Sequence, residues 1–392
     1  MTATRFVCPF CPLHCDDLEP SAGVGSSSDC PILSDLGPRS FAHDRDTPPP
    51  QSSQLDQARQ WVRAARTIAV TGRVIDLETA RAVSRFVSRT GAGLLPLVAP
   101  DDLYPEVFAR GGGIGTTLGE ASSPHQTVIV IGDPDPQWPR LRQRLTGAGK
   151  TYFWQGSDQI VARLARLRGK LAHPRGQSTA ASDGLDDADV ATTHELVRDS
   201  EAVVFLIVPA AVAAEEQRLL WSTAGGLIAD LNRRTRAMLL RFDESLTLRS
   251  VVAWTREAPT ARLIEPDAIG GNEPLATNGD VDLVIEMTPW GDRGSLPNGT
   301  GPRRDSGRSD AGAGPRDKRR ITIGQNACGG GEGSPDVAAA ETSRALHLPA
   351  STPGITGRSM AIRGDGSIAL PLGMWAETGL PTAAEWLEKL EM

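Results

Sequence analysis

Four of the five cysteines lie within the first 30 residues, at Cys8, Cys11, Cys15 and Cys30. Their spacing, C-x2-C-x3-C-x14-C, allows three thiolates on one short loop to converge, and the fourth comes from farther along the chain. Four thiolates suit either a [4Fe–4S] cluster or a tetrahedral zinc ion. We predict a metal bound by these four cysteines, with the x2/x3 spacing favouring a [4Fe–4S] cluster and zinc as the alternative. Reduced thiols without a metal are the remaining interpretation.

The other residues that carry chemistry show no comparable pattern. Cys328 follows an expected strand and is interpreted as a small apolar residue at the strand end. The six histidines form no H-x-H or HExxH pair, and His14, inside the cysteine loop, is expected to be exposed, with tuning of a cluster by hydrogen bonding as the alternative. The sequence has no GxSxG or Walker motif, and the glycines at 111–115 are interpreted as a turn first and a ligand loop second. No catalytic residue is predicted.

Composition places the chain among folded globular proteins. Of its 392 residues, 39% are hydrophobic and 23% charged, and the formal net charge is −7. The acidic balance argues against a nucleic-acid partner, which requires a basic face. No apolar run is long enough to span a membrane, and the first residues do not resemble a signal peptide, so we expect a cytoplasmic protein without a membrane partner. Thiols stay reduced in that compartment, which again favours metal binding over disulfides.

Short apolar runs alternate with helical patterns along most of the chain. Strands are predicted at 67–71, 94–98, 127–131, 202–208, 237–242, 282–287 and 321–324. Helices are predicted after Leu77, after Ser157, at about 211–223 and at 382–390, with loops at 48–53 and 173–192. Strands separated by helices predict an α/β fold with mainly parallel, doubly wound sheets.

Three regions are expected from these patterns. Residues 1–50 form an irregular cysteine-rich metal segment and linker, residues 51–260 form α/β domains, and residues 261–392 form a C-terminal α/β portion. Within the last region, residues 290–320 are dense in Gly, Arg, Asp, Ser and Pro. Such a composition cannot bury enough apolar surface to offset the entropy of ordering, so a disordered insertion is predicted there.

Several motifs together resemble the family of B-type subunits of formylmethanofuran dehydrogenase. Residues 8–18, CPFCPLHCDDL, are similar to its N-terminal CPxCGxxCDD signature. Three further stretches resemble family segments in order and approximate spacing: Gly115–Glu120 (TTLGE), Asp230–Thr235 with Trp254 downstream (DLN…W), and Gly357–Gly366 (GTxxRxDG). The first motif is fairly specific, and the others carry weight jointly.

The resemblance implies a formate dehydrogenase/DMSO-reductase-like body with a small N-terminal Fe–S-like domain. Redox members of that family hold molybdenum or tungsten on a pterin through a cysteine or selenocysteine in a CHGPS-like loop shortly before the TTLGE segment. Here residues 97–106 contain no Cys, His or Ser, and no cysteine lies between Cys30 and Cys328. Redox chemistry at such a metal needs a soft ligand and an open position. We therefore expect the Mo/W-pterin to be absent.

The resemblance then favours the B position of a bacterial formyltransferase/hydrolase complex in methanopterin-linked conversion of formaldehyde to formate. In this interpretation the chain is a non-catalytic scaffold that keeps Cys8, Cys11, Cys15 and Cys30 as cluster ligands. The implied partners are an amidohydrolase-like A subunit, a C subunit and a formyltransferase D subunit. Two alternatives remain: a redox-active formylmethanofuran dehydrogenase component with Mo/W-pterin and a [4Fe–4S] cluster, and a zinc- or cluster-bearing adaptor protein.

Overall fold

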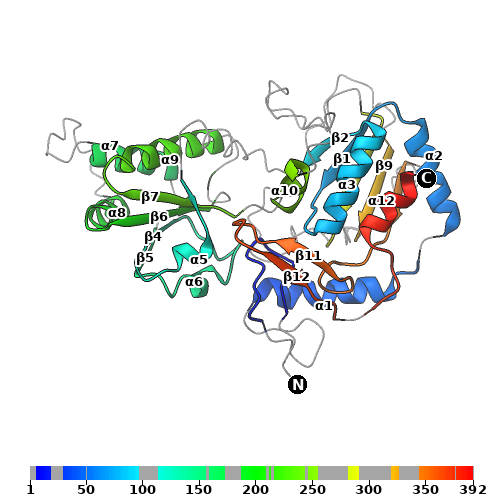
Figure 1. The fold of residues 1–392 in the computed structure, drawn as a ribbon, viewed down its shortest axis with the longest axis horizontal. Coiled ribbons are helices and arrows are strands. Elements are labelled where there is room, and N and C mark those ends of the chain that lie inside the picture. The colour runs from blue at the N-terminus through cyan, green and yellow to red at the C-terminus, as the bar shows by residue number, and fades with distance from the viewer. Residues whose placement is uncertain are drawn as a thin grey trace, which may run out of the picture. The chain divides into compact units, whose positions relative to one another are not determined.

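The computed structural model divides the chain into two compact units, each built from segments remote in sequence (Figure 1). Unit 1 contains Met1–Leu97, Glu244–Gly364 and Ile368–Met392, and unit 2 contains Val98–Asp243 and Asp365–Ser367. The structure describes residues 6–18, 30–49, 51–96, 114–155, 159–172, 187–208, 212, 216–242, 246–254, 281–290, 319–325, 344–375 and 377–391. None of the helices in these ranges is long and apolar enough to cross a bilayer.

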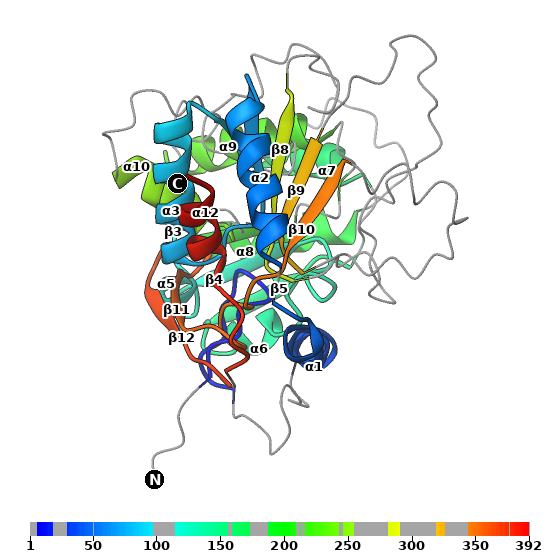
Figure 2. The same cartoon turned by 90° about the vertical axis from the view of Figure 1, so that its right-hand side faces the viewer.

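Unit 1 is organised around a parallel five-stranded sheet with the order β10-β9-β8-β1-β2. Its strands are β1 (Ile68–Gly72), β2 (Gly93–Pro96), β8 (Leu283–Thr288), β9 (Arg319–Gly324) and β10 (Ala345–Leu348). Strands β8, β9 and β10 lie side by side in Figure 2. The chain builds outward from β1 to β2 on one side and from β8 to β10 on the other, so a topological switch point lies between β1 and β8.

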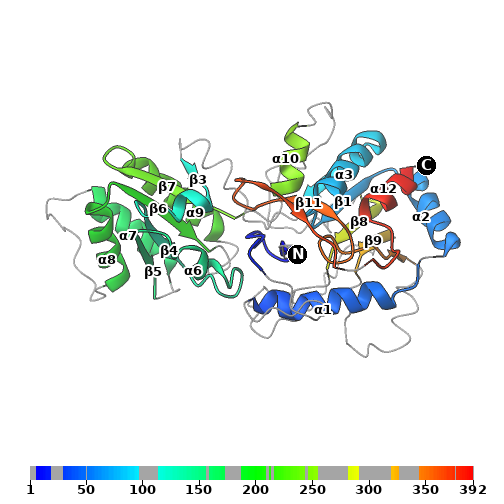
Figure 3. The same ribbon diagram turned by 60° about the horizontal axis from the view of Figure 1, so that its bottom comes forward.

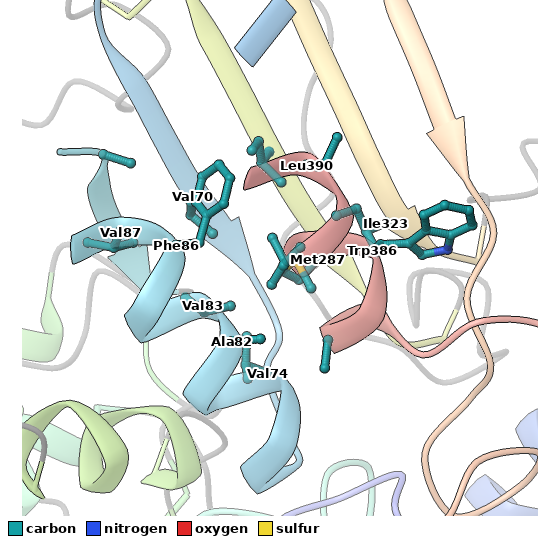
Figure 4. Packing of buried hydrophobic residues seen from close by; sticks show 14 of the residues in the cluster. Val70, Val74, Ala82, Val83, Phe86, Val87, Met287, Ile323, Trp386 and Leu390 are labelled. Atoms are coloured by element: carbon teal, nitrogen blue, oxygen red, sulfur yellow. The ribbon is translucent and has the colours of Figure 1, made fainter. Parts of the chain in front are cut away.

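The helices of unit 1 that contribute to its core are α2 (Ser52–Ala64), α3 (Leu77–Thr90), α10 (Leu246–Trp254) and α12 (Ala383–Glu391). Residues at both ends of α3 define its limits. Asp76 caps the start by accepting a hydrogen bond from the Thr79 N–H at 2.8 Å, and Gly91 ends the helix with a φ of +70°. Between these residues Val83 and Phe86 lie fully buried on one face. They pack with Met287 of the sheet in the core shown in Figure 4.

Two further elements complete unit 1. The first is α1 (Pro31–Asp46), which begins directly after Cys30 and continues through Pro38. The second is an antiparallel hairpin of β11 (Ser359–Ile362) and β12 (Ala369–Leu372). Figure 3 shows this hairpin beside the N-terminal cysteine loop, in dark blue, with α1 beneath.

Unit 2 has a second parallel five-stranded sheet, in the order β3-β7-β6-β4-β5. Its strands are β3 (Gly115–Thr116), β4 (Thr127–Ile131), β5 (Lys150–Phe153), β6 (Ala202–Ile207) and β7 (Arg236–Leu240). Helices α7 (Ile160–Ala172), α8 (Ala188–Arg198) and α9 (Gln217–Leu231) pack in one core against the sheet, whereas α5 (Leu118–Ala121) and α6 (Leu141–Arg144) lie on the opposite face (Figure 1). Strand β4 is buried along its whole length, as expected for a strand covered on both faces.

The prediction of an α/β fold with parallel sheets is confirmed, while several local predictions are wrong. Residues 31–46, expected to be irregular, form α1, and the expected linker at 48–53 already enters α2 at Ser52. The helix expected at 211–223 lies at 217–231. The expected loop at 173–192 gives way to α8 from Ala188, and Arg319 and Arg320 belong to β9. Residues 291–318 of the predicted insertion and residues 173–186 lie outside the described residues.

Candidate metal centre

Three of the four predicted ligands lie on a hairpin-like loop of residues 6–18. An antiparallel bridge joins Phe6 to Leu18, and the Cys8 N–H donates to the Cys15 carbonyl at 2.9 Å. At the far end of the loop the His14 N–H donates to the Cys11 carbonyl at 3.1 Å, which closes a tight turn. Cys8 and Cys15 therefore face each other across the loop, and Cys11 begins the turn.

The fourth cysteine arrives at the loop from helix α1. Cys30 is the N-cap residue of that helix, its carbonyl accepts the Ser34 N–H at 2.9 Å, and Pro31 occupies the first helical turn, where its missing N–H costs nothing. A side-chain hydrogen bond connects Cys30 with Cys8. Because the positive end of a helix dipole favours negative charge, this position suits a thiolate or an anionic cluster.

All four cysteines are buried, with exposed fractions of 1% to 4%, and no disulfide joins them in the described part of the chain. The hydrogen bond with Cys30 raises the pKa of the Cys8 thiol well above its ordinary value, and burial raises it further. The charges of Cys11, Cys30 and Cys15 add to this effect. The structure therefore gathers the four predicted ligands at one place, where their negative charges disfavour one another.

A metal with positive charge is the group that such a set of donors would fit. Soft thiolate ligands select zinc and iron–sulfur clusters, and metal binding replaces the mutual repulsion of the thiolates by attraction to a cation. Among the described residues, however, no group of three or more His, Cys, Asp or Glu side chains is arranged to hold a single metal ion. The donor set fits a thiolate-bound centre in its chemistry and burial, and binding would have to draw the sulfurs into coordinating positions.

His14 is buried rather than exposed, which corrects the expectation from sequence. Its exposed fraction is 5%, and its Nδ1 lies 3.0 Å from the carbonyl oxygen of Cys8. Its backbone φ is +40°, in the left-handed region that residues other than glycine rarely adopt. The cysteine spacing located this histidine between two candidate ligands, but the contacts that bury it come from the fold.

The C-terminal hairpin holds the cysteine loop in place. The Gly364 N–H donates to the Pro12 carbonyl at 2.8 Å, and Arg363 lies 3.4 Å from the carboxylate of Asp16. Val7 packs with three buried hairpin residues, Ala361, Leu370 and Leu372. Two stretches that carry the family resemblance, residues 8–18 and 357–366, therefore contact each other through residues of unit 1.

The loop also lies beside the switch point of the unit 1 sheet. Phe10 contacts Trp290, which follows β8, edge to face with ring centroids 5.5 Å apart. The guanidinium of Arg73, which follows β1, lies 6.0 Å from the same indole ring. The cysteine loop therefore contacts the chain that leaves the carboxyl end of β8, the edge at which parallel α/β sheets bind ligands.

A buried carboxylate that the sequence analysis missed fixes the other end of α1. Asp44 is 1% exposed and accepts hydrogen bonds from the side chain of Gln325 at 3.1 Å, from the Thr352 N–H at 2.8 Å and from the Thr356 hydroxyl. Gln325 directly follows β9 and also donates to the Ser40 carbonyl at 3.2 Å. No motif marks these residues, because they are far apart in sequence and only the fold unites them.

Two other resemblance segments, Gly115–Glu120 and Asp230–Thr235, have structural roles in unit 2. Thr117 caps α5 by accepting the Glu120 N–H, and the Leu118 N–H donates to the Asp365 carboxylate at 2.7 Å. Asn232 exchanges two hydrogen bonds with the backbone of Ala237, both of 2.9 Å, and so joins the end of α9 to β7. These contacts give both segments a role in the fold of unit 2.

Two histidines outside the cysteine loop lie near each other. The rings of His43 and His347 have centroids 6.5 Å apart, and the Nε2 of His347 lies 2.7 Å from the Gly324 carbonyl. Burial lowers the pKa of His347, so its neutral form is favoured. Cys328 and the segment 97–106, where the resemblance would place the pterin metal ligand, lie outside the described residues, as do Gly111, Gly112 and Gly113.

Among solved structures, the chain is similar to a chain of the formyltransferase/hydrolase complex (FhcABCD) from Methylorubrum extorquens, determined in complex with methylofuran. The TM-score is 0.57, the sequence identity is 18%, and the match covers 86% of this chain and 94% of that chain. No family model and no curated protein matches the sequence. At this identity the comparison shows a shared fold that extends over nearly the whole of both chains.

Proposed function

We propose that this chain is a subunit of a formyltransferase/hydrolase-type complex that converts formyl groups carried on a methanofuran-like cofactor to formate. The observation that supports this proposal is the shared fold over 86% of this chain and 94% of a chain from such a complex. The four sequence stretches that resemble the B-type subunits of formylmethanofuran dehydrogenase point to the B position. The partners would be an amidohydrolase-like subunit, a formyltransferase subunit and a C subunit.

Within the complex, the chain would act as a scaffold stabilised by a metal centre. Cys8, Cys11, Cys15 and Cys30 would hold a [4Fe–4S] cluster, with zinc as the alternative, because all four are buried and the other three each raise the pKa of Cys8. When bound, the metal would supply thiolate bonds that connect the loop of residues 6–18 to the start of α1. Transfer and hydrolysis of a formyl group move no electrons, so this centre needs no redox partner.

Co-purification tests the membership of the complex. The tagged full chain is isolated from its native cells without oxygen, and the proteins that accompany it in stoichiometric amount are identified by mass spectrometry. We expect a formyltransferase and an amidohydrolase-like protein. A chain that elutes alone from native cells, with neither protein associated, contradicts the proposal and favours the adaptor interpretation. Stoichiometric molybdenum, tungsten or pterin would instead support the redox-active alternative.

Metal analysis of the same preparation tests the centre. We expect iron and acid-labile sulfide in the wild type, or zinc if the centre is a zinc site. The bound metal should be lost in the Cys8→Ser and Cys30→Ser variants. The fifth cysteine offers a matched control: Cys328→Ser removes one thiol from the chain and leaves the four proposed ligands in place. Equal metal content in the ligand variants and the control would show that the four cysteines do not hold it.

A further inference from the structure

We infer that His14 is a positioning residue of the four-thiol site, which fixes the backbone that carries Cys8, Cys11 and Cys15. The inference rests on the proposed metal centre and assigns a role to a residue that is not itself one of the four ligands. It follows from three properties of His14: the hydrogen bond of its ring, the bond of its backbone N–H, and its left-handed conformation.

The ring of His14 acts as a hydrogen-bond donor within the loop. Its Nδ1 lies 3.0 Å from the Cys8 carbonyl oxygen, and a carbonyl oxygen can only accept a hydrogen bond. Nδ1 must therefore carry a proton and donate it to Cys8. Hydrogen bonds that orient the backbone or side chains around metal ligands are a recurrent feature of metal sites, and their loss weakens metal binding.

One residue thereby ties together two cysteines. The His14 ring holds the carbonyl of Cys8, while the His14 N–H donates to the carbonyl of Cys11 at 3.1 Å. The Cys8 N–H in turn donates to the Cys15 carbonyl at 2.9 Å. The backbone groups of all three loop cysteines thus belong to one hydrogen-bonded network, to which the His14 ring contributes a side-chain bond.

The backbone of His14 has an uncommon, left-handed conformation. Among the non-glycine residues that the structure describes, only His14 and Gln159 have a positive φ, of +40° and +52°. A left-handed conformation is unfavourable for most L-residues and persists where surrounding contacts hold it, often at functional sites. Here it allows the ring to turn back onto Cys8 from a residue that also closes the turn at Cys11.

Asparagine is the matched substitution that isolates the role. Its side-chain amide can donate from a position close to that of the histidine Nδ1, and asparagine tolerates left-handed backbone better than most residues. His14→Asn should therefore keep both the bond to Cys8 and the turn. His14→Ala loses the bond and is strained, whereas His14→Gly loses the bond and relieves the strain.

The test compares these variants as full chains, reconstituted without oxygen with ferrous iron and sulfide. The readouts are the iron retained against a competing chelator and the electron paramagnetic resonance spectrum of the reduced protein. We expect His14→Ala and His14→Gly to retain iron about ten- to a hundred-fold more weakly, with an altered spectrum, and His14→Asn to resemble the wild type. Gln159→Ala, which changes the other left-handed residue, should leave both readouts unchanged.

Three results would overturn the inference. If His14→Gly retains iron within about twofold of the wild type, the ring is not needed. This comparison can be made even if His14→Ala fails to fold. A loss in His14→Asn as large as in His14→Gly would show that the bond to Cys8 is not the reason. Wild-type protein that takes up neither iron nor zinc would remove the centre itself. Co-purification with the partner proteins is a separate readout, so the complex can stand while the inference fails.

Discussion

The Asp44→Asn substitution tests whether the far end of α1 controls the position of Cys30 at its start. Asp44 is buried near the C-terminal end of this 16-residue helix and binds donors from Gln325, Thr352 and Thr356. Asparagine has almost the same shape but replaces one acceptor oxygen by a donor group. Whichever way the amide is oriented, it opposes the Gln325 side-chain amide on one side or the Thr352 N–H on the other.

The expected loss follows from these contacts. A hydrogen bond to a charged group contributes about 1.5–3 kcal/mol, and a buried donor left without an acceptor costs about 1–3 kcal/mol. Gln325 keeps its bonds to Ser40 and Thr352, but the charge-assisted bond is lost and the amide group introduced by the substitution faces a donor instead of an acceptor. We therefore expect the free energy of unfolding to fall by about 3 kcal/mol. For a unit of this size that corresponds to a melting temperature lower by roughly 6–12 °C.

The assay combines thermal unfolding, followed by circular dichroism, with metal retention against a chelator. We expect Asp44→Asn to lower both the melting temperature and the retention, because a loosened α1 no longer holds Cys30 against Cys8. Asp35→Asn is the control on the same helix: Asp35 and Arg39 form an exposed pair, whose loss costs at most about 0.5 kcal/mol. A melting temperature equal to that of the control, or lower stability with unchanged metal retention, would refute the reasoning.

Three further predictions concern stability. Burial raises the pKa of the Asp76 carboxyl above its ordinary value of about 4, so the native state binds the carboxyl proton more tightly than the unfolded state does. The free energy of unfolding should therefore fall as the pH rises from the ordinary pKa through the raised one. Asp76→Asn should flatten this pH dependence, measured by urea unfolding over the same pH range. Arg163→Ala leaves the buried carboxylate of Asp189 without its cation, and the free energy of unfolding should drop by about 3 kcal/mol in chemical denaturation, more than in Arg163→Lys. Gly72 has a φ of +105°, and an added Cβ would lie 2.2 Å from a backbone oxygen of β8. Gly72→Ala should therefore prevent folding of unit 1 as judged by solubility and circular dichroism. Gly91→Ala, with nothing within 4 Å of the added Cβ, should cost only about 1–2 kcal/mol because of the φ of +70° at that position.

Local patterns were enough to predict the elements whose residues are neighbours in sequence. The strand predicted at 127–131 is β4, and the periodic apolar residues after Leu77 and Ser157 form α3 and α7. Helix α1 was missed because Gly37 and Pro38 lie within it, and both disfavour a helix interior. Its stability comes from tertiary contacts, such as those of Asp44, which override the local preference.

The edge strand β5 shows a similar limit. Lys150–Phe153 is short and at most half-buried, and although Thr151, Tyr152 and Phe153 favour strands, they form no buried apolar run of strand length. It forms because β4 offers its free edge as a parallel partner. The polar residues around Asp44 likewise carry no motif, and only the meeting of α1, β9 and the loop at Thr352 makes them a network.

The sequence by itself determined the donors of the candidate centre, because Cys8, Cys11 and Cys15 are separated by only two and three residues and so lie close together in any fold. It also determined the parallel α/β class, because the alternation of apolar runs and helical periods depends on neighbouring residues. Only the tertiary structure decided that Cys30 joins the other thiols at the start of α1 and that His14 is buried. Burial depends on what covers the loop, and the covering residues, such as Gly364, come from the opposite end of the chain.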